Sequence, residues 1–108
     1  MALFGGNVAV KDQRSEPREE VFYRTRARRP NGMTVPLQIV NVSANGFMAR
    51  TDEELEVGHK LYLKLPVVGA VTAEIRWSLG GRIGCQFEEM VGLVAYLDML
   101  TELVRGTR

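Results

Sequence analysis

Two arginines stand four residues apart near the start of the chain, in the run RSEPR at residues 14–18. Pro17 disfavours a helix here, so we expect an extended loop in which the side chains of Arg14 and Arg18 converge on one anion. A guanidinium group is a planar set of donors suited to bidentate contacts with phosphate, and its face can stack on a base. The pair predicts an anion-binding loop, and a solvated basic loop is the simpler alternative.

A second group of small polar residues follows at residues 41–46, in the run NVSANG. Asn41 and Ser43 carry short donors and acceptors of the kind that can read the edge of a base. We expect Asn45 and Gly46 to reverse the chain through positive φ angles, and Gly46 to let a ligand approach the backbone. In the alternative interpretation this is a structural turn, in which Asn41 and Ser43 hydrogen-bond to their own backbone.

Strands must position both groups, because most of the chain between residues 21 and 87 alternates between apolar and polar side chains. The alternation predicts strands at 21–29, 35–41, 47–51, 60–65, 71–79 and 82–87. Asn31-Gly32 and Gly80-Gly81 are typical hairpin turns between such strands. Short strands expose their edges unless the sheet closes, so the pattern favours a small antiparallel barrel.

The hydrophobic period changes near residue 90. Leu93, Leu97, Leu100 and Val104 share one face of a helix, and we expect that face to pack against the barrel. Gly106 is a helix-stop signal. The predicted fold class is therefore all-β, a six-stranded antiparallel β-barrel with one C-terminal α-helix.

Length and composition indicate one soluble domain: 108 residues, of which 45% are hydrophobic and 25% charged. No apolar run is long enough to span a membrane, and the single cysteine, Cys85, excludes an internal disulfide and suits a reducing cytoplasm. Residues 11–29 carry seven basic side chains against four acidic ones, which would attract an anion to this end of the chain. We divide the chain into a flexible segment, 1–13, and a domain, 14–108.

The two polar runs, in this order and with a hairpin between them, resemble the RxxxR and (D/N)xSxxG motifs of the PilZ domain family. Residues 75–77 and 81–87 also look like the family's final pair of strands, and the resemblance covers roughly residues 14–105. It implies a six-stranded barrel that binds the bacterial second messenger cyclic di-GMP on its outer surface.

The resemblance also implies roles for individual residues. Arg14 and Arg18 would hold phosphates and guanine faces, Asn41 and Ser43 would hydrogen-bond a guanine, and Gly46 would keep the turn open. Secondary contacts are expected from Arg24, Arg26 and Asn45.

We therefore expect a non-enzymatic cytoplasmic receptor, with no cofactor besides its ligand and no metal. Binding would order the N-terminal arginine loop and so change a surface that a downstream protein recognises. The domain would act as a monomer or a homodimer. One alternative is a PilZ-like interaction module that binds no ligand.

The other alternative is a small basic barrel that binds nucleic acid. Arg24, Arg26, Arg28 and Arg29 follow one strand and suggest such a stripe. We favour a charged, solvated strand face instead, because no cluster of exposed aromatics accompanies these arginines to stack bases.

The remaining chemically distinctive residues have structural interpretations. We expect Cys85 to be buried within its strand and therefore inert, which argues against a nucleophilic pair with His59. The acidic run at residues 52–56 is interpreted as a solvated loop, and Trp77 as a core residue on the same face as Ile75.

Overall fold

The computed structural model describes residues 18–106, so Arg14 and the expected flexible segment 1–13 lie outside the described residues. Within them the chain forms strands and then a helix, in the order β1 (Glu19–Arg28), β2 (Thr34–Ser43), β3 (Gly46–Arg50), β4 (Lys60–Leu65), β5 (Gly69–Leu79), β6 (Arg82–Phe87) and α1 (Leu93–Gly106). Each strand covers most of the range expected from its alternation.

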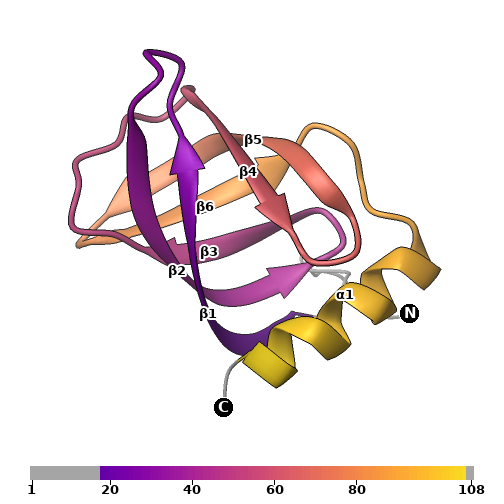
Figure 1. Ribbon diagram of the computed structural model, residues 1–108. Helices are drawn as coiled ribbons and strands as arrows, with labels where there is room; N and C mark the ends of the chain where they lie inside the picture. Colours follow the sequence, from indigo (N-terminus) through magenta and orange to yellow (C-terminus); the bar gives the residue numbers. More distant parts are fainter. Residues whose placement is uncertain (1–17, 107–108) are drawn as a thin grey trace, which may run out of the picture.

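The strands close into a barrel in the order β1-β2-β3-β6-β5-β4, and every neighbouring pair is antiparallel (Figure 1). The barrel closes where Ala27 of β1 faces Leu63 of β4 and Arg28 faces Tyr62. Closure gives each strand two partners and leaves no long unpaired edge. The expected fold class, a six-stranded antiparallel barrel with one C-terminal helix, is confirmed.

Two of the connections are the hairpin turns expected from their glycines. Gly32 ends the β1–β2 turn with a φ of 89°, and Gly80 and Gly81 join β5 to β6 with φ angles of 63° and 80°. Only glycine adopts such angles without a steric cost, so these turns set the register of the hairpins that they close.

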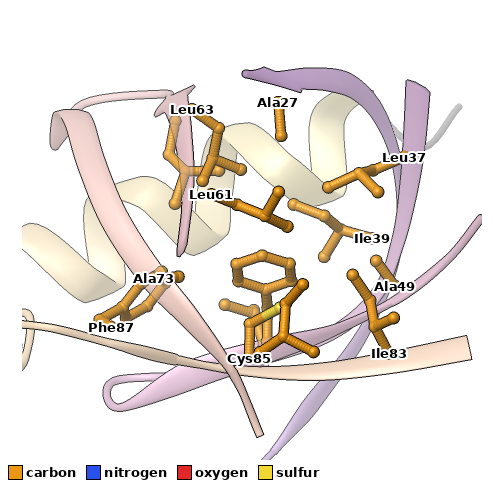
Figure 2. Packing of buried hydrophobic residues seen from close by; sticks show 14 of the residues in the cluster. Ala27, Leu37, Ile39, Ala49, Leu61, Leu63, Ala73, Ile83, Cys85 and Phe87 are labelled. Atoms are coloured by element: carbon orange, nitrogen blue, oxygen red, sulfur yellow. The ribbon is translucent and has the colours of Figure 1, made fainter. Parts of the chain in front are cut away.

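The core fills the barrel with the inward-facing half of each strand's side chains (Figure 2). Ile39, Phe47, Leu61, Ile75 and Ile83 are among its largest fully buried members. The core occupies the interior, so any ligand site on the strands must lie on the outer face of the barrel.

A β-bulge in β5 reverses one expected orientation. Ile75 faces Cys85 of β6, but the next paired residue is Trp77, which faces Gly84, so Arg76 is an extra residue in β5. The inserted residue turns the following side chains to the other face of the sheet. The expectation that Trp77 lies in the core is therefore wrong: the indole is 40% exposed on the outside of the barrel.

The helix α1 packs against the barrel near β1, through a different face from the one expected (Figure 1). Tyr96, Met99 and Leu103 are buried, whereas Leu93 and Leu97 are 71% and 51% exposed. Val104 is also exposed, and Leu100 packs partly against the core. The helix is apolar on more than one side, so periodicity alone indicated the wrong contact face. Across residues 18–106, no helix is long and apolar enough to cross a membrane.

Candidate functional site

The two polar motifs meet on the outside of the barrel. Arg18 directly precedes β1, and Glu20 in β1 faces Asn41 near the end of β2. The Arg18 guanidinium donates a hydrogen bond from Nη1 to Oδ1 of Asn41 over 3.1 Å, although the two residues are 23 apart in the sequence. Arg18 is exposed. This contact joins an arginine of the first motif to the asparagine of the second.

A bulge in β2 brings Asn41 to the surface. Ile39 faces Ala49 of β3, and the next paired residue, Asn41, faces Met48, so Val40 is the extra residue. The Nδ2 atom of Asn41 donates a hydrogen bond of 3.7 Å to the Met48 sulfur. Arg18 and Met48 thus contact the two ends of this amide group, which favours one orientation of it.

The turn after β2 is rigid. Ser43 is only 1% exposed, and its hydroxyl accepts a hydrogen bond of 3.3 Å from the Asn45 backbone N–H. The carbonyl of Ala44 accepts the Val91 N–H at 2.9 Å, and the carbonyl of Asn45 accepts the Phe87 N–H at 2.7 Å. The end of β6 and the segment that follows it therefore hold the turn through two backbone hydrogen bonds. Here Ser43 acts as the structural turn residue of our alternative interpretation, and its contact with a guanine stays a prediction.

Gly46 is required for a steric reason rather than for its φ angle. Its φ is not positive, unlike those of the hairpin glycines such as Gly80 and Gly81. A Cβ atom at this position would lie 2.0 Å from the backbone oxygen of Cys85. Gly46 thus lets β3 lie close against β6, where it faces Gln86. The positive φ angles expected at Asn45 and Gly46 are wrong, since neither residue has one. The close approach at Gly46 is that of β6, and the approach of a ligand stays a prediction.

The strand register adds three residues to the candidate site that were not expected there from the sequence. Asn41 faces Met48, Met48 faces Gly84, and Gly84 faces Trp77, so these four form one row across β2, β3, β6 and β5. The indole of Trp77 covers Gly84, where an added Cβ would lie 2.0 Å from Nε1. A partly exposed aromatic ring therefore lies in the same row as Asn41, on the order of 14 Å away at three strand spacings. A glycine opposite a tryptophan would have indicated that the indole lies on this face. The bulge shifts the register, so alternation in the sequence did not show that Gly84 lies opposite Trp77.

The three residues expected to make secondary contacts with the ligand lie in different parts of the barrel surface. Asn45 is exposed at the turn, next to the buried Ser43. Arg24 and Arg26 lie on the outer side of β1, and Arg26 faces Pro36, five positions along β2 from Asn41. At about 3.4 Å per residue this is roughly 17 Å from Asn41. The structure therefore does not bring Arg26 to the Arg18–Asn41 pair.

Cys85 and His59, the nucleophile and base considered from the sequence, differ in their exposure. Cys85 is buried, and burial raises the pKa of its thiol to about 12, so at neutral pH it is protonated and inert, as expected. His59 is exposed, with Nε2 3.6 Å from Glu56 Oε1. No group of three or more His, Cys, Asp or Glu residues between 18 and 106 is placed to hold a metal ion.

Comparisons with known proteins agree with this fold. The family model described as the PilZ domain matches residues 12–104. No curated protein sequence matches the chain. Among solved structures, the chain is similar to the PilZ domain with c-di-GMP of YcgR from Escherichia coli, with a TM-score of 0.61. The two are 14% identical, over 85% of this chain and 89% of that chain, a likeness that concerns the fold. Because the family model spans most of the sequence and includes both polar motifs, the chain belongs to the PilZ domain family.

Proposed function

We propose that the protein is a receptor for cyclic di-GMP, which binds on the outer face of β2, β3, β6 and β5. The observation that carries the proposal is the hydrogen bond between Arg18 and Asn41, which unites the two motifs in one place. Family membership supports it, as does the fold shared with the c-di-GMP-bound domain of YcgR.

The chemistry of the row suits a planar, anionic ligand. Arg18 offers a guanidinium for a phosphate or for the face of a guanine, and Arg14 would join it as the other arginine of the first motif. The amide of Asn41 can both donate to and accept from a guanine edge. Trp77 offers an exposed ring for a second base, which favours a ligand with two bases over a mononucleotide. The turn at Ser43 and Gly46 holds this surface rigid.

The signal would pass through the arginine loop. Arg18 is exposed and bonded to a neutral amide, so a ligand phosphate offers it a stronger, charge-assisted partner. We propose that the ligand draws Arg14 and Arg18 together and that the rearranged loop changes the surface offered to a downstream protein in the cytoplasm. The protein acts in this scheme as a receptor and not as an enzyme.

The deciding experiment is calorimetric titration with cyclic di-GMP, accompanied by the fluorescence of Trp77, the only tryptophan in the chain. Saturable heat, and an emission change with the same midpoint, are expected because Trp77 lies in the binding row. GMP serves as the control ligand with one base. Absence of heat at micromolar protein, with the chain folded, would reject the receptor function.

A second candidate function is an adaptor that binds proteins without a ligand. The observation in its favour is the exposed apolar side of α1, with Leu93, Val94 and Leu97 at 71%, 74% and 51% exposure. Isolated apolar residues on a surface are normal, but a contiguous set is typical of interaction sites. A partner whose capture is unaffected by cyclic di-GMP would favour this function.

A further inference from the structure

A second row of side chains crosses the outer face of the barrel, one step along the strands from the Asn41 row. Arg24 of β1 faces Gln38 of β2, Gln38 faces Arg50 of β3, and Arg50 faces Arg82 of β6. The three arginines are exposed, and the row spans on the order of 14 Å at three strand spacings. The four strands are consecutive in the barrel, so the charges lie on one continuous surface (Figure 1).

This surface is hollowed on both sides of Arg50. A depression of about 740 Å³ is lined by Arg24, Arg26, Gln38 and Arg50, among others. A second one, of about 410 Å³, has Phe22, Val40, Asn41 and Met48 in its lining together with Arg50 and Arg82. The two depressions adjoin at Arg50, which lines both. We call this pair of depressions the arginine groove and define it by Arg24, Arg26, Arg50 and Arg82.

The positive charge of the groove is not balanced from within the described chain. Arg24, Arg50 and Arg82 form no ion pair with any acidic residue between 18 and 106, and Arg26 donates to the neutral hydroxyl of Thr34 over 3.0 Å. The acidic residues in the groove lining are Glu20 and Asp52.

Arg50 and Arg82 also face each other directly across β3 and β6. Like charges in this position destabilise a sheet, and arginine cannot relieve the repulsion by losing its proton. An anionic partner would remove this cost. We infer that the arginine groove binds an acidic segment of a partner protein, a function that goes beyond binding of the nucleotide.

The lining favours a peptide over a nucleic acid. Sites for single-stranded nucleic acid combine positive charge with several aromatic rings on which bases stack. Phe22 is the one aromatic residue in the groove lining, whose other apolar side chains at the surface include Pro36, Val40 and Met48. Short apolar surfaces between guanidinium groups suit a segment in which acidic and apolar side chains alternate.

The test is fluorescence anisotropy with a fluorescein-labelled octaglutamate peptide as the probe. Arg50→Gln/Arg82→Gln is expected to weaken binding about tenfold, the loss of two exposed charge-assisted contacts. The matched control is Lys64→Gln/Arg105→Gln, which removes the same charge from exposed positions outside the groove, on β4 and α1. The control is expected to bind within about twofold of the parent chain, because only groove contacts set the affinity.

Three results would overturn the inference. An equal loss of peptide affinity in the groove variant and in the control variant would show that the peptide responds only to the net charge of the protein. Tighter binding of an octathymidylate than of the peptide, lost in the groove variant, assigns the groove to nucleic acid. A drop of about tenfold or more in cyclic di-GMP affinity in the groove variant assigns Arg50 and Arg82 to the nucleotide site. Circular dichroism checks that each variant is folded. If the double variant is not, Arg24→Gln takes its place with Lys64→Gln as its control, and the loss of one contact is expected to weaken peptide binding about threefold.

Discussion

Arg18 and Asn41 are hydrogen-bonded side chain to side chain, over 3.1 Å from Nη1 to Oδ1. The bond is possible because β1 and β2 are antiparallel, which brings the residue before β1 next to the last residues of β2. An exposed bond between a guanidinium and a neutral amide adds little to stability. Its importance is positional, since it holds both groups at the place where we propose that cyclic di-GMP binds.

Removing either member of this pair is expected to weaken the binding of cyclic di-GMP. Arg18→Ala deletes a charge-assisted contact and should cost roughly 1.5–3 kcal/mol of binding free energy. Asn41→Ala deletes neutral hydrogen bonds and should cost about 0.5–1.5 kcal/mol. Isothermal titration measures both, with Arg105→Ala on α1 as an exposed control. Unchanged affinity in Arg18→Ala would contradict the assignment of the site.

Gly46→Ala is expected to destabilise the fold. The new methyl group would lie 2.0 Å from the backbone oxygen of Cys85, and a strand backbone cannot move away as a flexible side chain can. Overpacking of this kind costs about 1–3 kcal/mol of unfolding free energy. Urea unfolding measures it. Gly92→Ala is the control, because its methyl group would have no neighbour within 4 Å. Equal stability of the two variants would show that the contact between β3 and β6 relaxes freely.

Gly84→Ala is expected to displace the indole of Trp77 from the barrel surface. Its methyl group would lie 2.0 Å from Nε1 and 2.4 Å from Cε2 of the ring. The indole is partly exposed and can swing outwards, so we expect more solvent around it, a red shift of tryptophan emission and only a modest loss of stability, about 1 kcal/mol. Fluorescence of the free protein measures the shift. If Trp77 stacks on a base, cyclic di-GMP should also bind less tightly to this variant than to Gly92→Ala.

The two faces of α1 should respond differently to truncation. Met99 is fully buried, so Met99→Ala leaves a cavity and should cost about 2–5 kcal/mol of unfolding free energy. Leu97 is 51% exposed, and Leu97→Ala should stay within about 0.5 kcal/mol of the parent chain. Thermal or urea unfolding compares the two. A larger loss of unfolding free energy in Leu97→Ala than in Met99→Ala would mean that the helix packs through Leu93 and Leu97.

Cys85 should make the fold less stable in alkali. Burial raises the pKa of its thiol from 9.0 to about 12, so the unfolded chain loses this proton first as the pH rises. Between about pH 9 and 12 the folded state binds the extra proton, and stability falls by up to about 1.4 kcal/mol per pH unit. The Cys85→Ala variant lacks this pH-dependent contribution to the unfolding free energy. Its deficit in unfolding free energy relative to the parent chain should therefore shrink between pH 9 and pH 11. Urea unfolding under reducing conditions measures it, and parallel pH profiles would contradict the buried, protonated thiol.

The amino-acid sequence by itself determined the architecture and the composition of the site. Strict alternation places residues such as Ile39, Leu61 and Ile83 inside, because successive side chains of a strand point to opposite faces. Glycine-containing turns determined where the chain reverses, since Gly32, Gly80 and Gly81 adopt φ angles that other residues avoid. Both motifs could be identified in the sequence because residue types at a fixed spacing are local properties of the chain.

Only the tertiary structure decided which residues share the outer surface. A bulge inserts a residue without breaking the apolar pattern, so the sequence could not show that Trp77 turns outwards to cover Gly84. The helix is apolar on several sides, and contact with the barrel selected Met99 over Leu97. Arg18 reaches Asn41, and Arg50 faces Arg82, because the barrel closes with one particular register between strands far apart in the chain. Long-range pairing of this kind depends on packing in three dimensions, which no local pattern encodes.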